Sequence, residues 1–429
     1  MISKLIRNPK THLRNLLISP SHNAIIPLSC HDPPHHAYTQ LQTYVEVYMK
    51  RKKDTFFDSI DSIHKSLELK HIISLKNFFL SSSSSPHDNY CLPISAVSKK
   101  GLDFGINMKV LRFLRNYPSF FEEFKGPLYN LPWFRLTSEV IKLDKEERKM
   151  YEEYKDDIVG RLKKVILKSG TRKMLPLKII KGLQWYLGLP DEFFRDPLDY
   201  VGEYGCFRIV DIEDGLKGLA VFKEYGERKG SKIFSMMQKN AMRRGIYSGG
   251  ADEAIAFPLF PSKGLRLKQK IKDWLDEFQK LPYVSPYEDS SSLNPDSDIS
   301  EKRVVSLLHE LLCLFVEHAA ERKSIFCLRK YLGLPQKVHK AFERHPHMFY
   351  LSLKNKTCTA ILKEAYCDEL AIEPHPLAKV RKKYIALMKE SDVILKNRRL
   401  NNNRAFNQQN ACFEDSGCDD DKRSQLAEA

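Results

Sequence analysis

The sequence predicts a mainly α protein of the α+β class, built from tandem helix-turn-helix or winged-helix-like modules with short β-hairpins. Two observations carry this prediction. The segment YLGLP occurs at 186–190 and again at 331–335, and residues 104–121 align without a gap onto 332–349. After these segments come short β-prone runs, a pattern typical of hairpins. We therefore expect three related modules.

The N-terminal segment is basic and free of acidic residues. No acidic residue precedes Asp32, whereas four basic residues do: Lys4, Arg7, Lys10 and Arg14. This composition is typical of an organelle import signal, so we expect residues 1–36 to be a transit peptide. An ordinary basic tail is the alternative, because Pro9 interrupts the amphipathic helix of a mitochondrial presequence.

Residues 40–281 are expected to hold the first two modules. In the first, a helix ends near Gly105, and WFRLTSEVIKL from Trp133 supplies at least one strand. In the second, CFRIVDI and LKGLAVF flank the turn residues EDG and predict a hairpin. Glycine permits the left-handed conformation that ends a helix, and proline favours the first turn of the next one. Gly188 and Pro190 have this arrangement.

The third module is expected at 301–395, after a linker at 282–300 that is rich in Ser, Pro and Asp. Its second helix has an apolar face at helical spacing, formed by Val338, Ala341, Phe342 and His345. Pro346 should end that helix, and MFYLSL and TCTAIL predict the hairpin. Residues 396–429 are polar and without periodicity, so we expect a disordered tail.

Composition restricts the class of protein. Lys and Arg number 70 against 54 Asp and Glu, which gives a formal charge of +16 and predicts a polyanionic partner. No apolar run approaches the roughly 18 to 20 residues of a membrane span. The nine cysteines have no zinc-ligand spacing, which favours reduced thiols. Cys313 and Cys327 lie in apolar helical context, where inert burial is expected.

The chain resembles the plant organelle RNA recognition (PORR) domain family from about Tyr44 to Lys389. The similar blocks include VYMKRKKDTFFDSI, VLRFLRNYPSFF, LPWFRLTSE and LHELLCLFVEHAAERKSIFCLRKYLGLP. The resemblance implies a non-catalytic RNA-binding protein, imported into mitochondria or chloroplasts, that promotes splicing of group II introns. Its implied partners are single-stranded or structured intron RNA and other splicing factors, with no cofactor. We expect a mitochondrial protein, with the chloroplast as the alternative.

Three groups of basic residues are candidates for RNA binding, because rows of cations release counterions from phosphates. In the first group, Arg161, Lys164 and Lys168 should align along the outside of a helix. The candidates are Arg161, Lys163, Lys164, Lys168, Arg172, Lys173, Lys178, Lys181, Lys232, Lys239, Arg243, Arg244, Lys337, Lys340 and Arg344. Any one charge run can equally be a solvated face.

The middle module differs in charge, because Asp191, Glu192 and Asp196 lie where the third module has lysines. Phosphate contact is therefore unfavourable there. Aromatic residues could stack on unpaired bases, but core packing is the better interpretation for Phe120, Trp185 and their neighbours.

An enzyme is not expected, because the sequence contains neither a phosphate-binding GxxxxGK[ST] loop nor a GxSxG elbow. The isolated histidines show no metal-ligand spacing. A winged-helix DNA-binding protein and a helical-repeat factor resembling transcription terminators are the alternatives. A basic helix-turn-helix can also enter the major groove of DNA, so the family resemblance is what favours RNA.

Overall fold

The computed structural model describes residues 53–82, 90–126, 131–170, 172–212, 215–222, 232–250, 253–368 and 370–415, with the backbone alone over 405–415. All of them belong to one compact unit, Gln40–Ala429. The expected transit peptide lies outside the described residues, as does the end of the expected tail.

The first module contains a helix, a short strand, two further helices and a hairpin. These elements are α3 (Ser66–Ser82), β1 (Leu92–Pro93), α4 (Ile94–Lys99), α5 (Val110–Arg115), β2 (Phe121–Lys125) and β3 (Pro132–Leu136). The sheet order is β1-β3-β2, and both pairs are antiparallel. Val110, Phe113 and Leu114 of α5 are buried against the sheet side of the module.

The second module repeats this order of elements. It consists of α7 (Lys155–Leu167), β4 (Met174–Pro176), α8 (Leu177–Leu187), α9 (Glu192–Arg195), α10 (Pro197–Val201), the 3-10 turn η2 (Gly202–Tyr204), β5 (Phe207–Ile212) and β6 (Leu216–Val221). The sheet order is β4-β6-β5. The predicted hairpin is confirmed, with Ile212 paired to Leu216 next to the turn.

The third module follows the same plan. It consists of α13 (Asp298–Cys313), β7 (Ala319–Glu321), α14 (Arg322–Cys327), α15 (His339–Arg344), β8 (Phe349–Ser352), η4 (Lys354–Lys356), β9 (Thr359–Leu362) and α16 (Glu364–Cys367). The sheet order is β7-β9-β8. Val338, Ala341, Phe342 and His345 are all buried, which confirms the predicted apolar face.

A strand placed before two helices, followed by a hairpin whose second strand lies in the centre of the sheet, is the winged-helix topology. The described residues contain it three times, so the predicted fold class is confirmed. Gly105, Gly188 and Gly333 have φ of +70°, +69° and +61°, as their place after a helix requires. The prolines lie earlier than expected, because α9 begins at Glu192 and α15 at His339.

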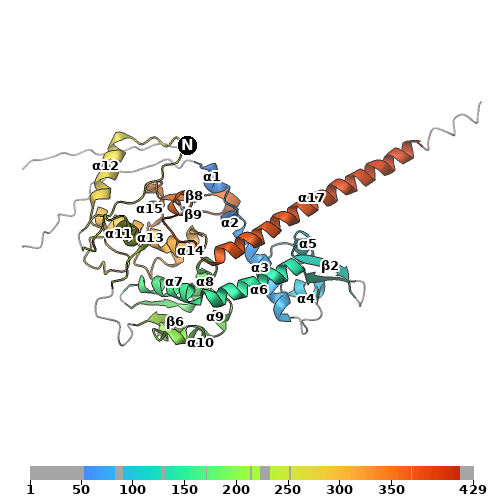
Figure 1. Ribbon diagram of the computed structural model, residues 1–429, viewed down its shortest axis with the longest axis horizontal. Coiled ribbons are helices and arrows are strands. Elements are labelled where there is room, and N and C mark those ends of the chain that lie inside the picture. The colour runs from blue at the N-terminus through green and yellow to red at the C-terminus, as the bar shows by residue number, and fades with distance from the viewer. Residues whose placement is uncertain are drawn as a thin grey trace, which may run out of the picture. The chain divides into compact units, whose positions relative to one another are not determined.

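Two long helices lie side by side in Figure 1: α6 (Ser138–Glu153) and α17 (Leu377–Asp415). The sequence analysis expected disorder from residue 396, but α17 continues through Asp415. No glycine or proline occurs between Leu377 and Asp415. Extending a helix that packing has already nucleated costs little, so polar residues continue it.

The ends of the chain's described part pack far from their neighbours in sequence. Helices α1 (Thr55–Asp58) and α2 (Asp61–His64) lie against the third module. There the ring of Phe57 stacks on Tyr350 at a centroid distance of 5.2 Å. The hydroxyl of Ser352 donates to Asp58 at 2.6 Å.

The second and third modules share one hydrophobic core, to which α11 (Met236–Arg243) and α12 (Gln269–Lys280) contribute. The stretch 282–300 was expected to be a linker between folded regions. It is packed instead, because Tyr283 and Ser285 are 2% and 1% exposed. The phenolic oxygen of Tyr287 also donates to Glu310 of α13 at 2.7 Å.

Candidate nucleic-acid interface

Helix α7 does not present the expected outward row of cations. Arg161 and Lys168 are 8% and 3% exposed, so the prediction that they line the outside is wrong. The third module covers this face. Arg161 donates to the carbonyl oxygen of Cys313 at 3.4 Å, and Lys168 lies 4.9 Å from the ring of Tyr287. Burial lowers the pKa of Lys168 to about 8.

Arg161 also forms an ion pair with Asp157, with 2.7 Å between Nε and the carboxylate oxygen. A helix with one buried face would have left both cations in solvent. Helix α7 is buried on two sides, a fact that local periodicity does not contain. Arg161 and Lys168 therefore belong to the junction between modules.

The next cations of the first group are half-buried: Lys163, Lys164 and Lys173. Lys173 donates to the carbonyl oxygen of Leu167 at 2.7 Å, near the end of α7. Burial lowers the pKa of Lys164, and the charge of Lys239 lowers it further. The fold thus brings Lys164 of α7 close to Lys239 of α11, two positions that are far apart in the sequence.

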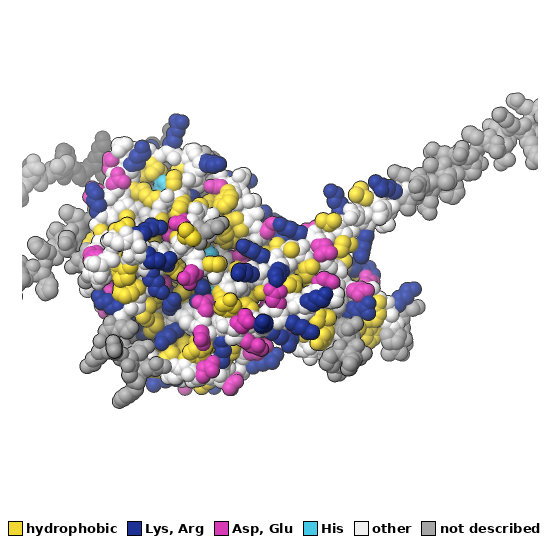
Figure 2. All heavy atoms as spheres, in the orientation of Figure 1, with side chains coloured by type: hydrophobic (Ala, Val, Ile, Leu, Met, Phe, Trp, Pro, Cys, Tyr) yellow, Lys and Arg dark blue, Asp and Glu magenta, His cyan; other side chains and the backbone are white. Residues whose placement is uncertain are grey.

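Nine candidates are exposed: Arg172, Lys178, Lys181, Lys232, Lys239, Arg243, Arg244, Lys337 and Lys340. Some already have partners within the chain. Lys181 lies 4.2 Å from the ring of Phe194, and Arg244 lies 3.5 Å from Asp368. Lys337 and Lys340 extend from the start of α15, opposite its buried face. Figure 2 shows Lys and Arg side chains interspersed with acidic ones over the visible face.

Arg344 does not continue the row of Lys337 and Lys340 into solvent as expected. Its guanidinium forms an ion pair with Glu301 at 2.7 Å and lies 5.2 Å from the ring of Trp274. Burial opposes ionisation of Glu301, but His345 and Arg344 outweigh it and lower the pKa of this carboxyl. Arg344 therefore joins α15 to α12 and α13.

The middle module has the acidic segment that the sequence indicates. Asp191 and Glu192 are exposed at the start of α9. Asp191 accepts hydrogen bonds from Asn77 at 2.9 Å and from Gln184 at 2.8 Å. It thus connects α3 of the first module to α8 of the second.

Helix α17 adds exposed cations that the sequence analysis did not include: Lys379, Lys382, Lys396, Arg398 and Arg399. Part of this set lies in the segment that was expected to be disordered. The absence of helix-breaking residues through Asp415 was the signal that could have revealed it.

Most of the aromatic residues considered for base stacking belong to the core, as expected. Phe120, Phe121, Phe349 and Tyr350 are at most 3% exposed. Trp185 is different, because it packs on the core and also lines a pocket.

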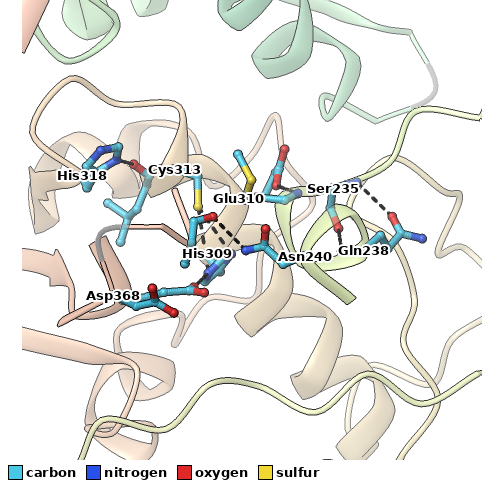
Figure 3. Close-up of polar contacts among 12 residues, drawn as sticks. Ser235, Gln238, Asn240, His309, Glu310, Cys313, His318 and Asp368 are labelled. Atoms are coloured by element: carbon cyan, nitrogen blue, oxygen red, sulfur yellow. Dashed lines mark hydrogen bonds and ion pairs between the residues drawn. The ribbon is translucent and has the colours of Figure 1, made fainter. Parts of the chain in front are cut away.

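A buried polar network lies between α11 and α13 (Figure 3). His309 is 2.5 Å from a carboxylate oxygen of Glu364, and the sulfur of Cys313 is 3.6 Å from Nδ1 of His309. Burial opposes charge on His309, but Cys313 and Glu364 raise its pKa well above the ordinary value. Burial also raises the pKa of the Cys313 thiol. A buried neutral thiol is a poor nucleophile.

The other thiol expected to be buried, that of Cys327, is exposed at the end of α14. Groups of three or more His, Cys, Asp or Glu residues that could hold a metal ion do not occur in the described part of the chain. None of the described helices combines the length and the apolar character that crossing a membrane requires.

A strongly basic chain that repeats a winged-helix topology three times and exposes lysines beside its helices defines a nucleic-acid recognition protein. The sequence model of the plant organelle RNA recognition domain matches residues 52–393. The chain therefore belongs to this family, as its sequence blocks predicted.

Named relatives agree with this membership. The chain is 58% identical over 366 residues to Protein WHAT'S THIS FACTOR 9, mitochondrial, of Arabidopsis thaliana, with 84% of this chain and 90% of the relative covered. It is 27% identical to the Arabidopsis Protein WHAT'S THIS FACTOR 1 homolog, chloroplastic, over 80% of this chain and 64% of that protein. The first relative confirms the prediction of a mitochondrial protein. No solved structure matches the chain.

Proposed function

We propose that the protein binds intron RNA in the mitochondrion and promotes the splicing of group II introns. The observation that carries this proposal is the match of residues 52–393 to an RNA recognition family. The net charge of +16 and the exposed cations of α8, α11 and α15 support it. These cations would neutralise phosphates and release counterions.

The chemistry of RNA restricts how such modules can act. The major groove of an A-form helix is too deep and narrow to admit side chains, so contacts fall on single strands, loops or the backbone. Lys337 and Lys340 would contact phosphates at the third module. The acidic start of α9 would be turned away from them.

The protein would act without catalysis of its own, as a binder that stabilises one form of the intron. Supporting this, the one Cys-His-Glu arrangement seen among the described residues is buried, and the pKa of its thiol is raised. We further propose that residues 1–36 direct import and are removed. Other splicing factors would be its protein partners.

A filter-binding comparison tests the proposal. Purified protein would be titrated with structured group II intron RNA and with duplex DNA of matched length, at two salt concentrations. Tighter binding of intron RNA is expected. Sequencing of the RNA that co-purifies from mitochondria should recover one or a few introns. Tighter binding of duplex DNA would favour the alternative of a DNA-binding protein.

A further inference from the structure

A pocket of about 500 Å³, part of it open to solvent, lies where the three modules meet. Its walls come from α2 and α3, from the end of α8, from β7 and from the start of α17. The charged and aromatic side chains that line it are Lys70, Trp185, Tyr186, Glu317, Glu321 and Arg381. Pockets of this size and mixed character hold small organic groups.

Lys70 is the cation at the aromatic wall of this pocket. Its Nζ lies 5.5 Å from the ring centroid of Trp185 and 5.0 Å from that of Tyr186. Within the described residues, no carboxylate lies close enough to form an ion pair with it. Burial lowers the pKa of Lys70 to about 8, so the ammonium ion lacks full solvation and direct neutralisation.

Trp185 is held in place from the other direction by Arg381. The guanidinium carbon lies 3.7 Å from the indole centroid, and Nη2 donates to the carbonyl oxygen of Trp185 at 2.7 Å. The tryptophan thus combines a fixed ring, partial burial and a place on a pocket wall.

The charged pair behind this ring is incompletely satisfied. Nη1 of Arg381 and Oε1 of Glu317 lie 3.8 Å apart, and both atoms are buried without a hydrogen bond to any described residue. Arg381 is only 3% exposed. Buried polar atoms nearly always have partners, so an unpaired donor and acceptor in one pocket wall indicate a missing group.

We propose that this pocket takes one unpaired nucleotide of the bound RNA, with the base against Trp185 and Tyr186 and the phosphate near Lys70. The inference rests on the proposed function and adds where a base is contacted. An aromatic face supplies stacking, a cation supplies the phosphate contact, and hydrogen-bonding groups meet the edge of the base. The hydroxyl of Thr357 and the amide of Asn355, at the same pocket, supply such groups.

Fluorescence of Trp185 tests the inference directly, because the chain has three tryptophans. In the variant with Trp133→Phe and Trp274→Phe, all tryptophan emission comes from Trp185. Titration with intron RNA should quench this emission in parallel with the anisotropy of the labelled RNA. Trp185→Leu should lower RNA affinity about ten-fold, the order of magnitude for one stacked base.

Lys70→Gln is the second variant, with Lys65→Gln as its matched control on the neighbouring turn. Lys65 pairs with the exposed Asp392 at 3.2 Å and does not line the pocket. Lys70→Gln should weaken binding several-fold, Lys70→Arg should restore it, and Lys65→Gln should have little effect. Thermal melts would confirm that each variant is folded.

The outcomes separate the two proposals. If the RNA binds but Trp185 emission does not change, and Lys70→Gln matches Lys65→Gln, the pocket assignment is wrong and the proposed function stands. If no RNA binds to the parent protein, the proposed function fails and the pocket assignment fails with it.

Discussion

Lys76 of α3 lies 2.8 Å from Glu147 of α6, with only 3% and 9% of the two side chains exposed. Asp144 forms a second ion pair with the same ammonium. Tyr384 of α17 donates to Glu147 at 2.9 Å. One buried cation therefore joins three helices that come from distant parts of the sequence.

Replacement of Lys76 by Met should destabilise the protein strongly. It would leave two buried carboxylates without their cation, and breaking a buried ion pair costs about 3–5 kcal/mol. Lys65→Met is the control, because its partner Asp392 is 67% exposed and such surface pairs contribute about 0–1 kcal/mol. Urea denaturation of both variants measures the difference. Equal midpoints would contradict the structural role of Lys76.

Gly188→Ala and Gly333→Ala should differ, although both glycines end a helix with positive φ. Each substitution forces alanine into the left-handed region, at a cost of about 1–2 kcal/mol. At Gly188 the new Cβ would also lie 2.9 Å from His375 and 3.1 Å from Leu377, whereas nothing lies within 4 Å at Gly333. The melting temperature of Gly188→Ala should be clearly the lower. Similar values would mean that the surroundings of Gly188 yield freely.

Exposed lysines of the third module should contribute to RNA affinity and to its salt dependence. Lys337→Ala with Lys340→Ala should weaken binding of intron RNA and reduce the slope of log affinity against log salt by about 0.7 per lost contact. Asp191→Asn with Glu192→Gln should leave affinity unchanged or raise it slightly. Titrations at several salt concentrations measure both, with thermal melts as controls. Small, equal effects from the two pairs would identify the lysines as a solvated face.

The stability of the protein should rise with pH above neutrality because of Lys302. Burial lowers the pKa of this lysine to about 7, and its Nζ donates to the carbonyl oxygens of Gln279 and Leu281 at 2.9 and 2.6 Å. An unfolded lysine has a pKa of about 10.4. Between these values the unfolded chain binds more protons, so raising the pH favours folding by up to about 1.4 kcal/mol per pH unit.

Lys302→Met removes this titration and should flatten the pH dependence. It also leaves two carbonyl oxygens without their donor, an effect that does not depend on pH. Urea midpoints of both proteins at pH 7, 8 and 9 separate the two effects. Lys70 and Lys168, each with a pKa lowered to about 8, titrate in both proteins, so comparing them isolates Lys302. Parallel curves would show that Lys302 does not titrate in this range.

Local patterns predicted the modules but not the surfaces between them. Glycines after helices, β-prone runs and the apolar face from Val338 to His345 are readable because they depend on neighbours in sequence. The burial of Arg161 and Lys168 depends on α13 and Tyr287, more than 100 residues away. The pairing of Arg344 with Glu301 and the course of α17 are likewise long-range features. Charge runs were therefore found correctly, but their exposure was predicted only in part.

The packing of α17 on α6 and of α1 on the third module has a consequence for how the chain acquires its fold. Tyr384 and Met388 complete the core of the first module, and Phe57 meets Tyr350. Closing such long loops is entropically costly and slows folding. As the polypeptide leaves a ribosome N-terminus first, its earliest module stays incomplete until the last segment has been synthesised. Until then its apolar surface is exposed to aggregation, a stage at which chaperones act.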